Sequence, residues 1–220
     1  MNPVILIPAF NPPKLFPHLL KTVESVTDFP ILIVDDGSMP PIKHVSHTIL
    51  RNEKNMGKGN ALLTGLNHAL NAGYTHAVTL DADAQHDPVF IKEFLRIKPE
   101  TALVYGKREF HKDMPIHRRF SNKLTSLLIS LISRKSVLDS QCGYRRYHLE
   151  KTLKHHYKEQ GFQFETEVLL NLAMEGEKFA PIPITTLYQN ESSSINNILD
   201  TFKFIRLIIR SCFMKMGVKC

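Results

Sequence analysis

The feature that most constrains the fold is an alternation of short apolar runs with longer stretches of helical periodicity. Residues 4–7 and 31–34 are apolar and rich in β-branched side chains, which is typical of buried strands. Between them, leucines and valines recur at helical spacing after Pro12-Pro13, which we expect to open a helix. The chain therefore begins with a predicted strand, helix and strand.

The alternation continues to about residue 105 and then stops. It predicts strands at 48–50, 76–80 and 102–105, and helices at 57–72 and from Asp87-Pro88 onward. This order predicts an α/β fold with a mainly parallel sheet flanked by helices. Farther along we expect helices near 118–133, 163–175 and 196–213 and a strand near 182–186.

The composition is that of a folded protein with an uneven charge distribution. Apolar residues make up 43% of the chain, charged residues 22%, and the formal net charge is +7. Basic residues concentrate at 107–123, 145–158 and 203–219. We therefore expect the second half of the chain to face an anionic partner.

The three cysteines and the apolar runs bear on localisation. An odd number of cysteines without metal-ligand spacing argues against a disulfide framework and favours a reducing cytoplasm. No basic segment or cleavage site accompanies the first apolar run, so we expect no signal peptide. We also expect no membrane span, because no run reaches the roughly 18 apolar residues that one requires.

Two carboxylates one residue apart, Asp81 and Asp83, follow the strand predicted at 76–80. Strand side chains alternate, so both turn to the same side and can share one cation. Carboxylates suit Mg²⁺ or Mn²⁺, which complete their shells with water and phosphate, so a diphosphate is the expected partner. The alternative is a turn former beside a helix cap. A second acidic turn, Asp35-Asp36, ends another strand at the ligand-binding edge of such sheets and favours the metal site.

Four segments occur in a fixed order: Ile7-Pro8-Ala9-Phe10-Asn11, Val34-Asp35-Asp36-Gly37-Ser38, Asn55-Met56-Gly57-Lys58-Gly59 and Asp81-Ala82-Asp83-Ala84-Gln85-His86. From residue 4 to about 187 the chain resembles family 2 glycosyltransferases, in particular the dolichyl- or polyprenyl-phosphate hexosyltransferase branch. The resemblance implies a GT-A (Rossmann-like) fold, a nucleotide-sugar donor and a divalent metal, Mg²⁺ or Mn²⁺.

The resemblance also assigns donor-side roles. It implies that Asp81, Asp83 and Gln85 hold the metal, with Asp83 in the catalytic set, and that Lys58 reaches the diphosphate. The residues implied to bind the nucleotide-sugar are Pro8, Phe10, Asp35, Asp36, Lys58, Asp81 and Ala82. The family often has Glu after the Asn of the first segment, and Pro12 stands there instead, so this loop receives no base-binding carboxylate. We interpret His86 as a surface or packing histidine.

Basic residues follow the strand predicted at 102–105. Guanidinium groups bind phosphate bidentately, and by the resemblance Arg108 and Arg118 clamp the phosphate of a lipid acceptor, with Ser121 or Asn122 nearby. The alternative for Arg118 and Arg119 is a solvated helix face. A phosphate acceptor is already an anion at neutral pH, so in-line displacement with inversion needs little help from a base.

The segment 139–145 resembles the family's later D-x-Q-C-G-F-[RK] signature, which lies near the donor sugar. Asp139 is a candidate base for a hydroxyl acceptor or a ligand of sugar hydroxyls, and the alternative is a buried carboxylate satisfied by backbone amides. We interpret Cys142 as a packing residue. In the segment 164–167 the family has an acidic residue that faces the site, and we assign Glu167 to that position.

The helix predicted at 196–213 is amphipathic. Its apolar face carries Ile198, Phe202, Ile205, Ile209, Phe213 and Met216, and its basic face carries Lys203, Arg206 and Arg210. Such a helix suits a membrane interface, with the basic side chains toward anionic headgroups. The alternative is packing on the domain or on a partner subunit.

The favoured function is inverting transfer of a hexose or N-acetylhexosamine from a UDP- or GDP-sugar to a polyprenyl or related lipid phosphate, at the cytoplasmic membrane face. A second hypothesis keeps the donor and uses a hydroxyl acceptor with Asp139 as the base. A third is a non-catalytic module that binds nucleotide-sugar or nucleic acid, although carboxylates repel nucleic acid unless a metal bridges them. We expect one domain over 1–220, with 1–110 for the donor, 111–190 for the acceptor and 191–220 as the amphipathic helix.

Overall fold

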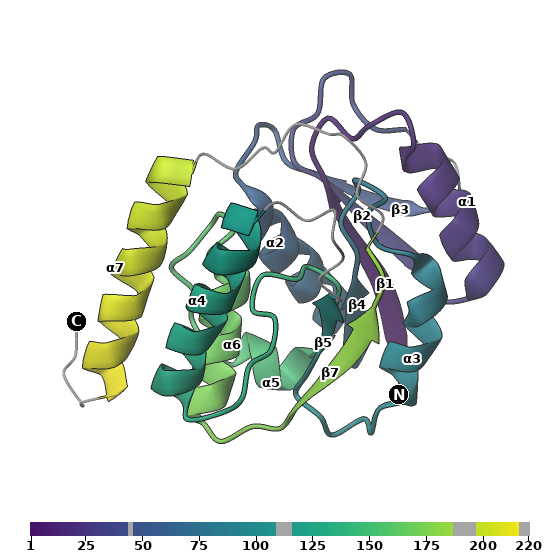
Figure 1. Cartoon of the computed structure of the whole chain (residues 1–220). Coiled ribbons are helices and arrows are strands. Elements are labelled where there is room, and N and C mark those ends of the chain that lie inside the picture. Colours follow the sequence, from purple (N-terminus) through teal and green to yellow (C-terminus); the bar gives the residue numbers. More distant parts are fainter. Residues whose placement is uncertain (44–45, 109–115, 187–196, 216–220) are drawn as a thin grey trace.

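The computed structural model describes residues 1–43, 46–108, 116–186 and 197–215, without the side chains of 116–121, 197–200 and 214–215. Its centre is a sheet of seven strands in the order β3-β2-β1-β4-β6-β5-β7 (Figure 1). The strands are β1 (Pro3–Ala9), β2 (Ile31–Asp35), β3 (Thr48–Arg51), β4 (His76–Thr79), β5 (Leu103–Arg108), β6 (Arg145–His148) and β7 (Phe179–Ile184). Every neighbouring pair is parallel except those that include β6, so the expectation of a mainly parallel sheet is confirmed.

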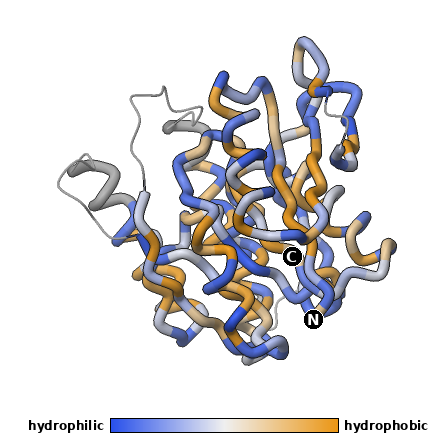
Figure 2. Tube along the Cα trace, turned by 90° about the vertical axis from the view of Figure 1, so that its right-hand side faces the viewer, coloured by the Kyte–Doolittle hydropathy of each residue, from blue (hydrophilic) through white to orange (hydrophobic). Residues whose placement is uncertain are grey.

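Helices cover both faces of the sheet and enclose two hydrophobic cores. The helices are α1 (Phe16–Val26), α2 (Lys58–Asn71), α3 (Ile91–Arg96), α4 (Ile116–Ser133), α5 (Leu149–Leu153), α6 (Phe164–Met174) and α7 (Asn197–Lys215). One core joins α1 and α3 to the sheet, and the other joins α2, α4, α6 and α7 to the opposite face. Hydrophobic segments accordingly run through the central strands (Figure 2).

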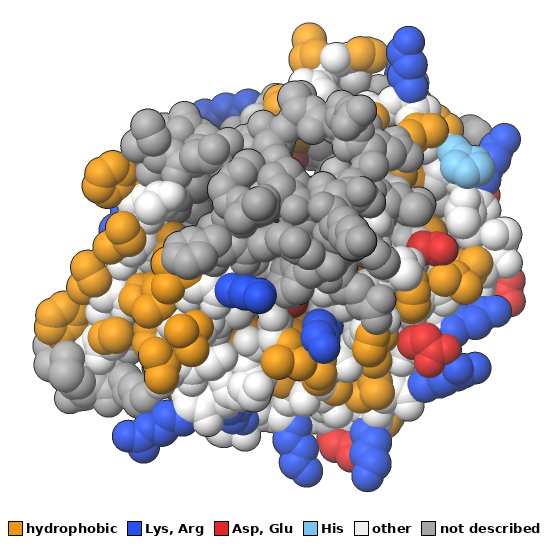
Figure 3. All heavy atoms as spheres, viewed as in Figure 1, with side chains coloured by type: hydrophobic (Ala, Val, Ile, Leu, Met, Phe, Trp, Pro, Cys, Tyr) orange, Lys and Arg blue, Asp and Glu red, His pale blue; other side chains and the backbone are white. Residues whose placement is uncertain are grey.

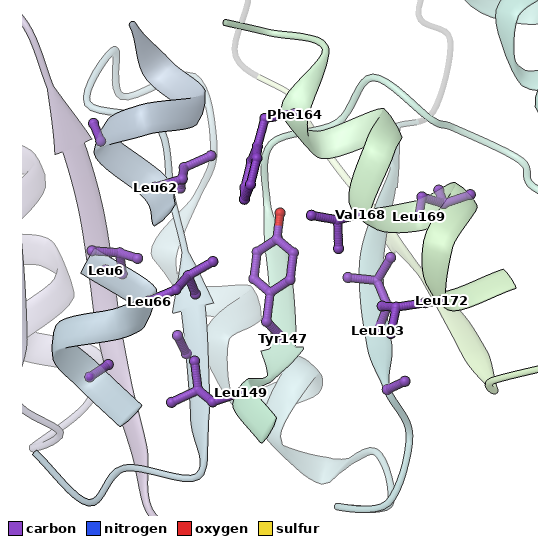
Figure 4. Close-up of a cluster of buried hydrophobic side chains, with 14 of the residues drawn as sticks. Leu6, Leu62, Leu66, Leu103, Tyr147, Leu149, Phe164, Val168, Leu169 and Leu172 are labelled. Atoms are coloured by element: carbon purple, nitrogen blue, oxygen red, sulfur yellow. The ribbon is translucent and has the colours of Figure 1, made fainter. Parts of the chain in front are cut away.

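The second core shows how the two halves of the chain are joined. Leu62 and Leu66 from α2 face Phe164 and Val168 from α6, and the ring of Tyr147 from β6 lies between them (Figure 4). All five side chains are buried. Tyr147 therefore links α2 of the first half of the chain to α6 of the second half.

Three boundaries differ from the sequence expectations. α1 begins at Phe16 with Pro17 in its first turn, so Pro17, and not Pro12-Pro13, supplies the pre-set backbone angle at the helix start. Asp87 accepts a hydrogen bond from the Val89 amide, as expected for a helix cap, but the segment begins with a 3-10 turn (Pro88–Phe90) before α3. β7 begins at Phe179, three residues before the predicted strand.

β6 is not predicted by the sequence pattern, because Arg145 and Arg146 belong to a basic segment that is typical of a protein surface. Both are fully buried. Arg145 donates to the carbonyl oxygens of Ser140, Cys142 and Glu165 at 2.6–2.8 Å. Arg146 donates to four carbonyl oxygens of the segment 94–101 at 2.6–3.3 Å. The expectation that this segment faces an anionic partner is therefore wrong for these two arginines.

The direction of β6 determines which residues meet at one edge of the sheet. The carboxyl ends of β1, β2, β4 and β5 lie at the same edge, because these strands run in parallel. β6 is antiparallel, so its amino end and the preceding segment 139–144 reach that same edge. None of the described helices is both long and apolar enough to cross a bilayer.

Candidate active site

The turn after β2 is held by Asp35. Its buried carboxylate accepts hydrogen bonds from the amides of Ser38 at 2.8 Å and Ile42 at 3.1 Å and pairs with Arg51. Burial alone would raise the pKa of Asp35, but these hydrogen bonds outweigh it and hold the pKa below its ordinary value. Asp35 therefore fixes the shape of the loop at the donor edge.

Asp36 holds a second loop, between β3 and α2. Its carboxylate accepts hydrogen bonds from Asn52 Nδ2 at 2.7 Å, the Met56 amide at 3.0 Å and the Gly57 amide at 2.8 Å. Gly57 has a φ of +96°, which a side chain would strain, and it leads directly into α2. Direct contact of Asp35 or Asp36 with a nucleobase stays a prediction, since both carboxylates engage internal partners.

The loop after β1 completes this side of the edge. The Asn11 amide donates to Ser38 Oγ at 2.9 Å, and Asn11 Oδ1 accepts from the Met39 amide at 2.8 Å. Pro8 is buried in β1, whereas the Phe10 side chain is 47% exposed. The exposed ring beside two fixed loops is a suitable surface for a nucleobase.

The predicted metal-binding residues lie in the loop after β4. Asp83 Oδ1 accepts a hydrogen bond from the Gln85 amide at 3.0 Å, and Ala84 between them adopts a φ of +58°. Asp81, Ala82, Asp83 and Gln85 are all partly exposed, so the loop presents its polar groups to the edge. Both carboxylates lie in this loop at the end of β4, and their sharing of one cation stays a prediction.

Lys58, the first residue of α2, reaches Asp81. Its Nζ lies 2.6 Å from Asp81 Oδ1 and 3.2 Å from Glu165 Oε2. Burial alone would lower the pKa of Lys58, but the two carboxylates raise it above its ordinary value. Gly143 allows this approach, because a Cβ there would lie 2.5 Å from Asp81 Oδ2 and 2.8 Å from Lys58 Nζ. The sequence analysis missed Gly143 and Glu165.

The oxygen ligands of the loop 81–85 suit a hard divalent cation. Asp81 and Asp83 offer carboxylate oxygens, Gln85 an amide oxygen, and Lys58 Nζ shows that Asp81 attracts positive charge. No group of three or more His, Cys, Asp or Glu side chains within the described part of the chain is placed to hold a metal. A cation at this loop would therefore rely on phosphate and water oxygens for the rest of its shell.

The structure rules out a surface position for His86 and agrees with a packing role, although its Nε2 also lies 3.9 Å from Asp81 Oδ2. It is buried, its ring stacks at a tilt on Tyr144 with centroids 5.5 Å apart, and it forms an isolated bridge with Thr186. Burial lowers its pKa to about 4, so the ring is neutral at physiological pH.

Across the edge, Arg108 at the end of β5 forms a bidentate pair with Asp139. Arg108 Nε lies 2.7 Å from Asp139 Oδ2, and a second guanidinium nitrogen lies 3.0 Å from Oδ1. Asn122 Nδ2 of α4 donates to the same Oδ1 at 3.2 Å, and Asn122 is also buried. The structure thus brings Arg108, Asn122 and Asp139 together; the side chains of Arg118 and Ser121 lie outside the described residues.

Asp139 is poorly suited to act as a base. Burial alone would raise its pKa, but the hydrogen bonds and charge of Arg108, with help from Asn122, hold the pKa below its ordinary value. Its oxygens already accept from these side chains and from the amides of Arg108 and Gln141. The structure is closer to the alternative, in which Asp139 is a buried carboxylate whose hydrogen bonds are all made within the protein. Side chains, rather than backbone amides alone, supply these hydrogen bonds.

The two clusters are electrostatically connected. Burial alone would raise the pKa of Asp81, but Lys58 outweighs this effect, and Arg108 also contributes to holding the pKa below its ordinary value. Cys142, which lies between Asp139 and Gly143 in the sequence, is fully buried. This burial raises its pKa to about 12 and agrees with a packing role. One edge of the sheet therefore carries carboxylates on one side and an oriented guanidinium on the other.

The assignment of Glu167 to the site is wrong. Glu167 accepts hydrogen bonds from the amides of Lys158 and Glu159 and pairs with Arg210 of α7 at 2.5 Å. Glu165 is the carboxylate on α6 that pairs with Lys58. Two residues that are two positions apart on a helix point in different directions, so only one of these glutamates can face the site. The helical spacing does not predict which of the two it is.

Comparison with known proteins agrees with this geometry. Residues 4–166 match the family model of glycosyl transferase family 2. A UDP-N-acetylglucosamine–dolichyl-phosphate N-acetylglucosaminyltransferase of Methanococcus voltae is 28% identical over 97% of this chain and 96% of its own length. An undecaprenyl-phosphate mannosyltransferase of Micrococcus luteus is 26% identical over 84% of this chain and 83% of its own length.

Solved structures show the same fold. Glucosyl-3-phosphoglycerate synthase from Mycobacterium tuberculosis, in complex with Mn²⁺, UDP and glucosyl-3-phosphoglycerate, aligns with a TM-score of 0.71 at 15% identity, covering all of this chain and 81% of that one. The same enzyme with Mg²⁺ and UDP gives a TM-score of 0.72 over 80% of its length. The fold is accordingly the expected GT-A fold. With its family model matched over most of its length, the chain belongs to glycosyltransferase family 2.

Proposed function

We propose that this enzyme transfers a hexose or N-acetylhexosamine from a UDP- or GDP-sugar to the phosphate of a polyprenyl or related lipid phosphate. The observation that carries the acceptor assignment is the bidentate pair of Arg108 with Asp139 opposite the loop 81–85. This pair fixes the orientation of the Arg108 guanidinium, a group that suits phosphate, and supports the acceptor assignment because the lowered pKa leaves Asp139 a weak base. The lipid-phosphate acceptors in the names of the two relatives support the same assignment.

On the donor side, the loops held by Asp35 and Asp36 form the walls of the nucleotide pocket, and the exposed Phe10 ring contacts the base. Asp81, Asp83 and Gln85 hold Mg²⁺ or Mn²⁺, which neutralises charge on the departing nucleoside diphosphate when bound. Lys58 exchanges part of its contact with Asp81 for a diphosphate oxygen. The Mn²⁺ and Mg²⁺ in the UDP complexes of the structural neighbour support this use of a metal.

The reaction joins these two sides in one step. An oxygen of the acceptor phosphate, oriented by Arg108 and Arg118, forms a bond to the anomeric carbon as that carbon's bond to the diphosphate oxygen breaks. The electron pair leaves with the nucleoside diphosphate, and the configuration is inverted. The acceptor is already an anion, so no proton has to be removed and Asp139 remains ionised as the partner of Arg108. Asn122 holds the other side of Asp139, and Ser121 is assigned to the same acceptor site.

The test compares two acceptors that differ only in the phosphate. The protein is incubated with Mn²⁺, one of a panel of UDP- and GDP-sugars, and either polyprenyl phosphate or the matching polyprenol. We expect nucleoside diphosphate release and a sugar-phosphate lipid with the phosphate alone, and none after chelation of the metal. Transfer to polyprenol in preference to the phosphate would establish the hydroxyl acceptor instead, and no transfer from any common donor to either lipid would overturn the proposal.

A lipid acceptor places the reaction at a membrane. We propose peripheral association with the cytoplasmic face of the membrane, where nucleotide-sugars are available, with the C-terminal helix as one point of contact. Fractionation of cells into cytosol and membranes tests this location: recovery with the membranes supports it, and recovery only in the cytosol contradicts it.

A further inference from the structure

Two neighbouring helices expose large apolar side chains on one side of the molecule. The α4–α7 apolar surface, as we call it, consists of Leu124, Leu127, Leu131, Phe202, Ile205, Ile209 and Phe213. Each of these side chains is 41–67% exposed. Figure 3 shows hydrophobic side chains gathered over α7 and the adjoining lower part of α4. A group of this size on a protein surface marks an interaction site.

The spacing of these residues makes the surface regular. On α4 they follow the pattern i, i+3, i+7 from Leu124, and on α7 the same pattern runs from Phe202 and continues to Phe213. Such a pattern puts the side chains of each helix on one face. The two helices contact each other and lie side by side (Figure 1). The two stripes therefore form one surface that is two helices wide.

This surface is not the side by which α7 packs on the rest of the protein. That contact uses Leu207, which is fully buried, and Arg210, which pairs with Glu159 at 3.2 Å and Glu167 at 2.5 Å. Arg210 is only 12% exposed, so the expectation that it points toward lipid headgroups is wrong. α7 thus carries a second apolar face in addition to the one that attaches it.

α4 connects this surface to the proposed acceptor site. Asn122, buried in the cluster with Arg108 and Asp139, precedes Leu124 by two residues and Leu127 by five. Five residues of helix span about 7.5 Å along the axis. In a polyprenyl phosphate the apolar chain begins at the carbon bonded to the phosphate, so a lipid whose phosphate lies at Asn122 would extend its chain past this distance. A bilayer holds such a lipid with its phosphate at the interface and its chain below. Lys123 and Lys203 are exposed beside the apolar stripes, where anionic headgroups would lie.

We propose that the α4–α7 apolar surface inserts into the acyl-chain boundary of one bilayer leaflet. It thereby holds Arg108, Asn122 and Asp139 at the depth of the headgroups. Insertion of apolar side chains, rather than attraction of α7's arginines to anionic lipid, supplies most of the binding. The inference rests on the proposed function, because the lipid nature of the acceptor identifies the bilayer as the partner.

The test measures binding of the full chain to vesicles without donor or metal. Vesicles of phosphatidylcholine alone are compared with vesicles that also contain phosphatidylglycerol, at about 0.1 M and about 1 M salt. We expect binding to the neutral vesicles that survives high salt. Binding that requires phosphatidylglycerol and disappears at high salt would overturn the proposal in favour of electrostatic attachment.

Paired substitutions locate the surface. Leu127→Asp with Leu131→Asp, and Ile205→Asp with Ile209→Asp, are each expected to weaken vesicle binding about tenfold or more, because each replaces inserted apolar area with charge. Phe29→Asp and Met174→Asp change exposed apolar residues outside this surface and serve as controls without loss of binding. A wild-type dimer that the α4 pair converts to a monomer, with no vesicle binding in either form, would assign the surface to a second copy instead.

A short polyprenyl phosphate that dissolves in water separates this inference from the proposed function. The paired variants are expected to keep transfer to the soluble acceptor while losing transfer to the acceptor in vesicles, which also shows that they are folded. Vesicle binding by a protein that transfers sugar to neither acceptor would support the surface and contradict the proposed function. Equal loss with both acceptors in the folded variants would overturn the role of the surface in docking.

Discussion

On the donor side of the site, Asp35 and Asp36 hold their loops largely through backbone amides, whereas on the acceptor side Asp139 holds the side chains of Arg108 and Asn122. The donor loops follow parallel strands directly, so each motif is continuous in the sequence. The acceptor cluster combines β5, α4 and the segment before β6, which meet because β6 is antiparallel. Each donor motif is therefore continuous in the sequence, although Asp36 also holds the loop after β3, whereas the acceptor cluster takes single residues from three separate elements.

We therefore expect some substitutions at this site to lower the rate of sugar transfer without lowering stability, and others to lower stability. The largest effect is expected for Asp83→Asn, which keeps an acceptor for the Gln85 amide but removes the charge that we propose binds the metal. We expect the rate of sugar transfer to fall about 1,000-fold, because this charge acts on the departing diphosphate. The midpoint of thermal unfolding without ligand should be unchanged, and a comparable fall in that midpoint would mean that Asp83 is structural.

For Arg145 we expect a loss of stability. Replacing it with Met leaves three buried carbonyl oxygens without their donor, so we expect unfolding free energy to fall by about 3 kcal/mol. Arg96→Met is the matched control, since Arg96 is 71% exposed and pairs with the exposed Glu93, and its loss should cost less than about 0.5 kcal/mol. Denaturant titration of the two variants makes the comparison. Equal stability would show that burial of Arg145 contributes little.

Asp35→Asn sharpens the description of the donor loops. At neutral pH we expect a loss of about 2 kcal/mol of unfolding free energy, because an amide nitrogen replaces an oxygen that accepts from Ile42 and pairs with Arg51. The pKa of Asp35 is lowered in the folded protein, so its stabilisation is complete above the pKa of the unfolded chain. It is lost as pH falls through the folded value. Denaturant titrations should therefore converge for wild type and variant in acid, and a difference independent of pH would contradict this account.

Asp139→Asn gives the smallest of these effects and tests the acceptor side. An uncharged side chain still contacts Arg108 but orients it less well, so we expect about a tenfold rise in the KM for polyprenyl phosphate with a smaller change in kcat. The acid limb of the pH–rate profile should be unchanged. A loss of about 1,000-fold in kcat together with a shift of that limb would identify Asp139 as a base.

The contrast also explains what the sequence could predict. Strands 31–34 and 76–80 were recognised because apolar runs end in acidic turns, and the carboxylates placed there do lie at one edge. β6 was missed because Arg145 and Arg146 resemble surface residues, and only the carbonyl oxygens that surround them explain their burial. Apart from those of Ser140 and Cys142, these carbonyl oxygens belong to Glu165 and to the segment 94–101, which are distant in the sequence, so the local pattern does not predict the burial.

The same reasoning applies to the glutamates of α6 and the helix α7. Glu165 and Glu167 are equivalent by local sequence, and the position of Lys58 on α2 and Arg210 on α7 decides which one faces the site. The apolar face of α7 was predicted, but its direction relative to the domain was not, because the helix has two apolar sides. The partner of each side is a property of the assembled fold.

The central claim is that the loop 81–85 holds a divalent metal together with the donor diphosphate. Electron paramagnetic resonance of Mn²⁺ with UDP or GDP tests it directly, in wild type, Asp83→Asn and the control Asp87→Asn, whose side chain caps the turn before α3. We predict that protein and nucleotide together bind Mn²⁺ in wild type and in Asp87→Asn, and that Asp83→Asn abolishes this binding. Equal Mn²⁺ binding by Asp83→Asn would contradict the account.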